Sequence, residues 1–204
     1  MSSSVPDRPS VDDGLPALQA AMPGYGRMQF ETKGLAVDAR GQVHVALEDG
    51  RIMRVNAEGR LRLVFDTVIN RGPGEVRRGT PTAMAIAPDG TIYLAMLEHR
   101  VWRIRGGEIV PFAGDGTDPG TAIPARLVPA TSPLHSPTSL AVGADGRVYI
   151  AERGRGRIRV VDAVGVMGLF AGNSLQPGGV ASDACWWTGA CPRAASSPGR
   201  RASR

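Results

Sequence analysis

Three histidines are the side chains of this 204-residue chain best suited to acid–base catalysis or metal binding. The residues around them do not predict a metal site. His44 lies in an apolar stretch, whereas His99 and His135 lie in turn-like and linker-like segments. A zinc or transition-metal site needs several His, Cys or carboxylate ligands at suitable spacing, and no such cluster surrounds any of the three. The chain also lacks the Gly-x-Ser-x-Gly motif that would support a nucleophilic serine. The sequence therefore predicts no catalytic residue, no metal and no cofactor.

A run of alternating arginine and glycine at 153–157 allows two sharper interpretations. Its glycines could begin a dinucleotide-binding fingerprint, but no third glycine follows, and residues 158–161 favour a strand over a helix. Arg153 and Arg155 could instead bind RNA or phosphate. The run aligns with turn residues elsewhere in the chain, which favours a hairpin loop over both.

The charge of the chain does not indicate a nucleic-acid partner. The formal net charge is +5, but residues 184–204 contain four arginines and no acidic residue, so the body carries only +1. Nucleic-acid binding is usually marked by a basic patch on the folded body. Cys185 and Cys191 lie in the same tail and form neither a disulfide framework nor a zinc site.

The sequence also predicts no contact with a membrane. No apolar run reaches the 18 residues that suggest a membrane span, and the N-terminal segment lacks the apolar stretch of a secretory signal. We therefore expect a cytoplasmic location by default, or an extracellular one if the chain belongs to a larger surface protein.

An internal repeat accounts for most of the chain. Apolar and turn residues recur in the same order in three copies, with part of a fourth, at about 30–66, 80–114, 136–172 and 177–183. The equivalent residues of the first predicted strand are Leu35, Met84 and Leu140. Each copy ends with an apolar strand centred on Phe65, Phe112 or Phe170.

Each copy is predicted to form four short strands, which in the third copy are 139–142, 147–152, 157–161 and 166–171. The turn between the first two strands contains Gly41, Gly90 or Gly146, and a glycine there accepts the positive φ of a tight hairpin. One acidic residue per turn is too few for a calcium loop. The strands are apolar at nearly every position, which predicts burial on both faces, as in the stacked sheets of a β-propeller.

At these positions the chain resembles the NHL-repeat family, whose repeats run approximately as Pro-x-Gly-[Leu/Val]-Ala-Val-Asp, Gly-x-[Val/Ile]-Tyr-Val-Ala-Asp and Asn-x-Arg-Ile. The third copy is closest, through 137–142, 145–152 and 157–160. Linkers that begin with Ala-Gly, at 113–116 and 171–173, resemble those of teneurin-type NHL repeats, which also occur in bacterial proteins. The resemblance implies an all-β fold, with a partial β-propeller of three four-stranded blades and the start of a fourth.

The repeat boundaries predict three parts of the chain. An N-terminal segment with a linker-like stretch covers 1–29, the repeats cover 30–183, and an Arg/Ser-rich tail, expected to be disordered, covers 184–204. Propellers usually close with four to eight blades. Three blades and a fragment therefore predict a piece of a larger propeller, or a chain that associates with itself through its open ends.

Strand direction places the candidate binding residues on one face. Because successive strands are antiparallel, the turns between the second and third strands leave a blade at the same end as the linkers to the next blade. We expect this end to carry a partner-binding face formed by His99, Asp115, Asp118, Arg153 and Arg155. Loops on a rigid scaffold commonly carry recognition. The leading interpretation is a non-catalytic scaffold that binds a protein or a glycan there, an inference by analogy with the fold.

Two alternatives remain open. Propellers related to NHL repeats include metal-dependent lyases and lactonases, which hold their ligands at the ends of inner strands. Here the inner strand at 83–87 offers no histidine or clustered carboxylate. The other alternative is a non-functional, truncated gene product. His44 aligns with Tyr93 and Tyr149 and is expected to be a structural strand residue.

Overall fold

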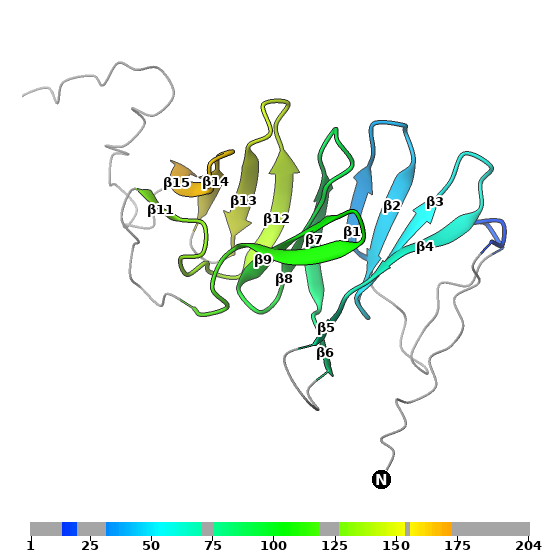
Figure 1. Cartoon of the computed structure of the whole chain (residues 1–204), viewed down its shortest axis with the longest axis horizontal. Coiled ribbons are helices and arrows are strands. Elements are labelled where there is room, and N and C mark those ends of the chain that lie inside the picture. Colours follow the sequence, from blue (N-terminus) through cyan, green and yellow to red (C-terminus); the bar gives the residue numbers. More distant parts are fainter. Residues whose placement is uncertain (1–13, 20–31, 71–75, 119–126, 154–155, 173–204) are drawn as a thin grey trace, which may run out of the picture.

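The computed structural model describes residues 14–19, 32–70, 76–118, 127–153 and 156–172, in which all regular structure is β (Figure 1). The first sheet contains β1 (Thr32–Val37), β2 (Val43–Leu47), β3 (Arg51–Val55) and β4 (Leu61–Asp66). The second contains β7 (Pro81–Ile86), β8 (Ile92–Met96), β9 (Arg100–Arg105) and β10 (Glu108–Ala113). The third contains β12 (Pro137–Val142), β13 (Val148–Glu152), β14 (Arg157–Val161) and β15 (Val166–Ala171). The predicted all-β, three-bladed partial propeller is confirmed.

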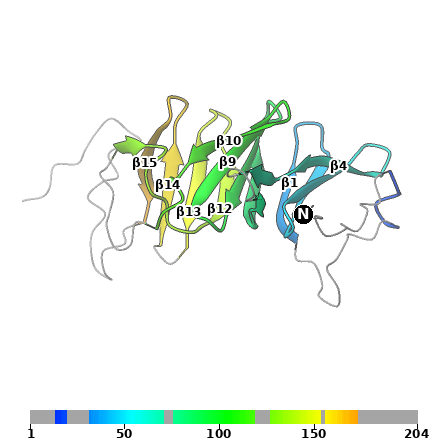
Figure 2. The same cartoon turned by 60° about the horizontal axis from the view of Figure 1, so that its bottom comes forward.

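The three sheets pack side by side through their first strands, so each is one blade (Figures 1 and 2). Strand β7 lies between β1 and β12 and contacts both. The registers of the three blades match, because Leu35, Met84 and Leu140 each pair with the central residue of the next strand. These three residues therefore occupy equivalent positions on neighbouring inner strands, as the repeat predicts.

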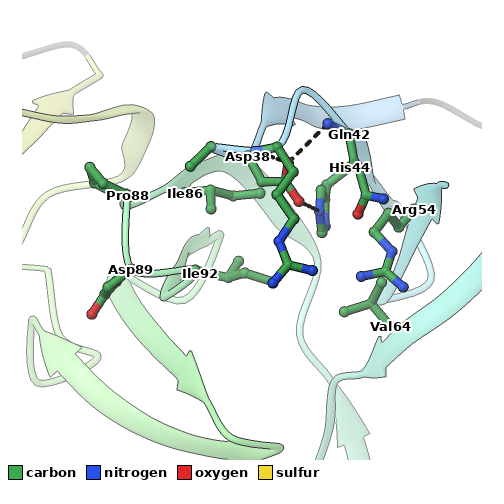
Figure 3. Close-up of a pocket in the computed structure, with 12 residues that line it drawn as sticks. Asp38, Gln42, His44, Arg54, Val64, Ile86, Pro88, Asp89 and Ile92 are labelled. Carbon is green, nitrogen blue, oxygen red and sulfur yellow. Dashed lines mark hydrogen bonds and ion pairs between the residues drawn. The ribbon is translucent and has the colours of Figure 1, made fainter. Parts of the chain in front are cut away.

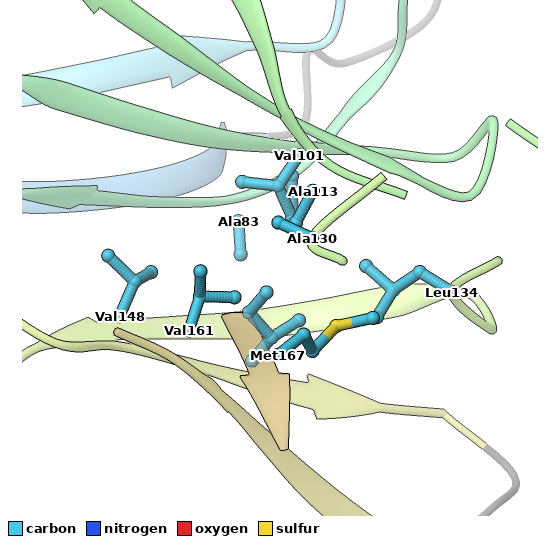
Figure 4. Close-up of a cluster of buried hydrophobic side chains, with 10 residues drawn as sticks. Ala83, Val101, Ala113, Ala130, Leu134, Val148, Val161 and Met167 are labelled. Carbon is cyan, nitrogen blue, oxygen red and sulfur yellow. The ribbon is translucent and has the colours of Figure 1, made fainter. Parts of the chain in front are cut away.

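Apolar clusters fill the space between blades. The cluster between the second and third blades includes Val101, Ala113, Val148 and Met167 (Figure 4). A separate cluster joins the first and second blades. The second blade is buried on both faces, as predicted for the strands. The inner strand of the first blade is not, since Leu35 is 64% exposed.

Close approach of two inner strands explains one glycine of the repeat. A Cβ atom on Gly34 would lie 2.8 Å from the Cβ of Met84 and 2.9 Å from its backbone nitrogen. Real Cβ contacts are longer than this, so β1 can pack against β7 only with a glycine at this position.

The predicted hairpin turns between the first two strands are confirmed. Gly41, Gly90 and Gly146 have φ values of 76°, 84° and 79°. In each turn an aspartate carboxylate accepts the backbone N–H group two residues ahead, as Asp145 does from Arg147 at 3.1 Å. Such side chains replace backbone hydrogen bonds and fix the turn.

One predicted equivalence is wrong. The last two strands of each blade contain a bulge, and the bulged residue is Val64 in the first blade, Phe112 in the second and Phe170 in the third. Phe65 instead pairs with Ile52 and is equivalent to Ala113. The extra residue of a bulge shifts the register by one, so the apolar centre of a strand does not reveal which residue is bulged.

Two linker elements were not predicted. Strand β11 (Leu127–Pro129) adds a fifth strand beside β15, and β5 (Val68–Asn70) pairs with β6 (Val76–Arg78) in a small hairpin. The predicted fourth repeat, the tail, both cysteines and Arg155 lie outside the described residues. Among the described residues, no helix has the length and apolarity needed to cross a membrane.

Candidate functional site

The candidate site lies at the end of the blades where the second and third strands connect, which we call the loop end. In each blade the residue before the arginine of the third strand has a positive φ: Gly50 at 86°, His99 at 56° and Gly156 at 58°. Two blades thus use glycine at a position that glycine favours, and the second blade uses a histidine. This position is therefore strained in the second blade only.

A second strained residue touches the first. Ser136 has a φ of 32°, and His99 and Ser136 are the only non-glycine residues with positive φ in the described part of the chain. The backbone N–H of Ser136 donates to Nδ1 of His99 at 3.0 Å. Because one nitrogen of a neutral imidazole accepts and the other donates, His99 keeps its proton on Nε2. The bond links the linker before the third blade to the turn of the second.

An imidazole–carboxylate pair lies next to this contact. Nδ1 of His135 donates to Oδ1 of Asp118 at 2.8 Å, and the side chains are 19% and 46% exposed. The neutral ring then has its lone pair on Nε2. The rings of His99 and His135 have centroids 5.9 Å apart and an interplanar angle of 37°. The loop end thus places Nε2 of His99, which donates, on a ring close to that of His135, whose Nε2 accepts.

Asp115 borders the cluster in a tight turn. Its carboxylate accepts from the backbone N–H and the hydroxyl of Thr117 at 2.8 and 2.7 Å, and its carbonyl accepts from the guanidinium of Arg100. Partial burial acts to raise the pKa of the Asp115 carboxyl, but the hydrogen bonds from Thr117 outweigh it and lower the pKa below its usual range. Asp115 therefore stays ionised and holds the start of the linker in place.

A buried charge cluster supports the loop end from within the third blade. The carboxylate of Glu152 pairs with Arg157 through both oxygens and lies 3.5 Å from Nε of Arg159. It also accepts the backbone N–H of His135 at 2.8 Å. All three charged side chains are at most 3% exposed. Burial lowers the pKa of the Arg159 guanidinium, in spite of the nearby carboxylate.

The structure brings most of the sequence-predicted residues together. His99 and Asp118 each bond to a residue of the same linker, and the exposed Arg153 donates its backbone N–H to the carbonyl of Ser136 at 3.0 Å. Asp115 lies one turn away in the same linker, and Arg155 is outside the described residues. Their role in binding stays a prediction.

Sequence reasoning missed His135 and Ser136 as members of this cluster. Their position just before the proline that opens the third blade was a usable signal, because a blade's first residue lies at the loop end. In the parts of the chain that the structure describes, no group of three or more His, Cys, Asp or Glu side chains could hold a metal ion.

Comparisons with known proteins agree with the architecture. Residues 134–161 match the family model of the NHL repeat, and no curated protein matches the chain. A crystal structure of a structural genomics protein of unknown function from Bacteroides thetaiotaomicron VPI-5482 is similar, with a TM-score of 0.53 and 19% identity. That match covers 69% of this chain and 35% of the other.

Virginiamycin B lyase from Staphylococcus aureus is also similar. Its catalytically inactive variant with quinupristin gives a TM-score of 0.51 at 16% identity, covering 81% of this chain and 45% of the lyase. A selenomethionine-substituted form gives 0.45 at 18% identity, with 67% and 40% covered. This chain thus spans less than half of each of these proteins, and likeness at such identity concerns the fold alone. The chain contains an NHL repeat within a β-propeller fold.

Proposed function

We propose that the chain is a binding module that recognises a protein or glycan partner through the loop end, with His99, Asp118 and His135 at its centre. The observation that carries the proposal is the contact between His99 and Ser136, the two strained residues. Such conformations cost about 1–3 kcal/mol each and often occur at functional sites. Glycine occupies the equivalent turn position in the other two blades, so the fold itself does not need a histidine there.

The chemistry of the loop end suits a ligand rich in hydroxyl or amide groups. Nε2 of His99 is a donor and Nε2 of His135 is an acceptor, while Asp118 adds a carboxylate beside the ring of His135. Neutral groups that donate and accept hydrogen bonds satisfy such a set better than a simple ion does.

Catalysis is the second candidate, and the Asp118–His135 pair is its support. A carboxylate that binds Nδ1 of an imidazole orients the ring and leaves Nε2 available as a general base. The resemblance in fold to virginiamycin B lyase suggests a substrate to test. If the chain converts quinupristin to a product that chromatography separates from it, and the His135→Asn variant does not, the catalytic candidate replaces the binding module.

Arrays of glycans and of peptides probed with the purified chain test the proposed function. We expect a defined set of ligands whose affinity falls about tenfold or more in Asp118→Asn and His135→Asn, since central polar contacts commonly dominate binding energy. Asp145→Asn, in an exposed turn at the opposite end of the third blade, is the matched control and should bind normally. Ligands that bind both loop-end variants as well as the unmodified chain would refute the proposal, as would the absence of any ligand.

A further inference from the structure

A cavity of about 310 Å³ opens between the first and second blades, at the end opposite to the loop end (Figure 3). Its walls come from the turn between β1 and β2, the adjoining parts of β2, β3 and β4, and the turn between β7 and β8. Small-molecule pockets commonly enclose about 300–1,000 Å³. The cavity therefore has room for a small ligand.

The cavity exists because the first blade lacks an aromatic pair that the other blades contain. In the second blade, Tyr93 packs edge-on against the bulged Phe112, with ring centroids 4.7 Å apart. The third blade repeats this pair at 4.9 Å. The register places His44 and Val64 at the equivalent positions of the first blade. These smaller side chains leave open the space that tyrosine and phenylalanine fill elsewhere.

Three buried polar atoms at this cavity have no hydrogen-bond partner. They are Oε1 of Gln42, Nδ1 of His44 and Nε of Arg54, and they make up half of the six such atoms in the described part of the chain. His44 is only 5% exposed. Buried polar groups in native proteins nearly always pair with another protein group or with ordered water, so a cluster of three around one cavity is available to a ligand that enters it.

The hydrogen-bond roles of these atoms follow from Asp38. Burial acts to raise the pKa of the Asp38 carboxyl, but bonds from the backbone of Gln42, the ring of His44 and the backbone of Arg40 outweigh it and lower the pKa. The ionised carboxylate can only accept, so Nε2 of His44 donates to its Oδ2 at 3.2 Å. Nδ1 of a neutral His44 is then an acceptor. The three atoms without a partner are thus two acceptors, Oε1 of Gln42 and Nδ1 of His44, and one cationic donor, Nε of Arg54.

The charges around the cavity favour an anionic ligand. Asp38 is already bonded as described, and Asp89 accepts from the backbone of Thr91 at 3.0 Å and lies 3.5 Å from Arg105. Within the described residues, the guanidinium groups of Arg40 and Arg54, which also line the cavity, have no carboxylate partner. Figure 3 shows Arg54 extending from its strand alongside Val64.

We propose that this cavity binds a small aliphatic carboxylate that carries a hydrogen-bond donor beside its carboxylate, as α-hydroxy and α-amino acids do. The carboxylate pairs with Arg54, and the neighbouring hydroxyl or ammonium group donates to Gln42 and His44. The aliphatic part packs against Val64, Ile86 and Ile92, which form the apolar wall. This site is independent of the loop end and of the function proposed for it.

Titration of the ¹⁵N-labelled chain with four probes tests the site, followed through the Nε–H signal of Arg54. The probes are 2-hydroxy-3-methylbutanoate, valine, 3-methylbutanoate without the donor, and valinamide without the carboxylate. We expect the first or the second to bind with a Kd of about 1 mM or tighter. The two incomplete probes should bind about tenfold or more weakly, because each leaves buried groups unsatisfied.

Variants taken from the chain's own repeat separate this site from general effects. Binding by the variants is measured by calorimetry, because Arg54→Gln removes the reporting signal. Arg54→Gln should weaken binding about tenfold or more, whereas Arg103→Gln, at the equivalent register position of the second blade, should not. His44→Tyr with Val64→Phe installs the pair that fills the other blades and should abolish binding. If this double variant does not fold, the Arg54 and Arg103 variants still decide the question.

Two results would overturn the proposal. One is the absence of any shift of the Arg54 signal with all four probes. The other is that 3-methylbutanoate binds as tightly as both 2-hydroxy-3-methylbutanoate and valine, or that Arg54→Gln binds as tightly as Arg103→Gln, since either would mean that the unpartnered groups do not contact the ligand.

Discussion

Replacing Glu152 with glutamine should destabilise the fold more than any surface substitution. Its carboxylate is fully buried and is the only anion paired with two buried guanidinium groups, those of Arg157 and Arg159, in the described third blade. Removing one partner of a buried ion pair typically costs about 3–5 kcal/mol, because the remaining charge is left uncompensated. Here two cations lose their partner, so we expect a value in the upper part of that range.

Urea unfolding monitored by tryptophan fluorescence measures this loss. The midpoint should fall without a large change in slope, and Asp145→Asn should leave it nearly unchanged. The first blade suggests a second comparison. In it, Leu47 and Met53 occupy the fully buried positions that are equivalent to those of Glu152 and Arg159. Adding Arg159→Met to Glu152→Leu should recover about 1 kcal/mol or more, because it removes one unpaired buried charge. A loss under about 1 kcal/mol for Glu152→Gln would refute the reasoning, since it would mean that water reaches the cluster.

Three further predictions test separate parts of the structure. His99→Gly should change the free energy of unfolding by at most about 1 kcal/mol, because the relief of backbone strain offsets the lost hydrogen bond to Ser136. The same variant should bind a loop-end ligand more weakly, which calorimetry would measure. Gly34→Ala should destabilise by about 1–3 kcal/mol, because its Cβ meets Met84 at 2.8 Å; an unchanged thermal midpoint would contradict the packing of the two inner strands. The pKa of Asp38 is lowered in the fold, so its contribution to stability is present above the unfolded pKa of about 3.9 and is lost as the pH falls through the folded value. The stability difference between the unmodified chain and Asp38→Asn should therefore shrink on acidification, and a difference that grows would contradict the hydrogen bonds assigned to this carboxylate.

Local patterns were sufficient to predict the blades. The strands of the third blade were placed within two residues of their observed bounds, because turn glycines and apolar runs mark strand ends directly. Strand β11 was missed because its partner, β15, lies about 40 residues later in the chain. Pairing over that distance leaves no periodic signal in the sequence.

The sites were harder to predict than the fold. The equivalence of turns places His99 at the same end of the blades as the linker that carries Asp118, because strand direction alone determines which loops share an end. It did not reveal the hydrogen bond to Ser136, which depends on the approach of two blades. His44 was predicted to be structural from its alignment with tyrosines. The cavity depends on the smaller size of His44 and on the bulge at Val64, and the bulge is visible only once the register is known.

The central claim is that successive blades pack through equivalent inner strands, which places the loop end on one side and the cavity on the other. Nuclear Overhauser contacts in the isotope-labelled chain measure this packing directly. The structure predicts cross-peaks between Gly34 and Met84, and between Thr82, whose hydroxyl donates to the carbonyl of Pro137 at 2.6 Å, and the start of β12. Strong signals within each hairpin without either of these contacts between blades would contradict it.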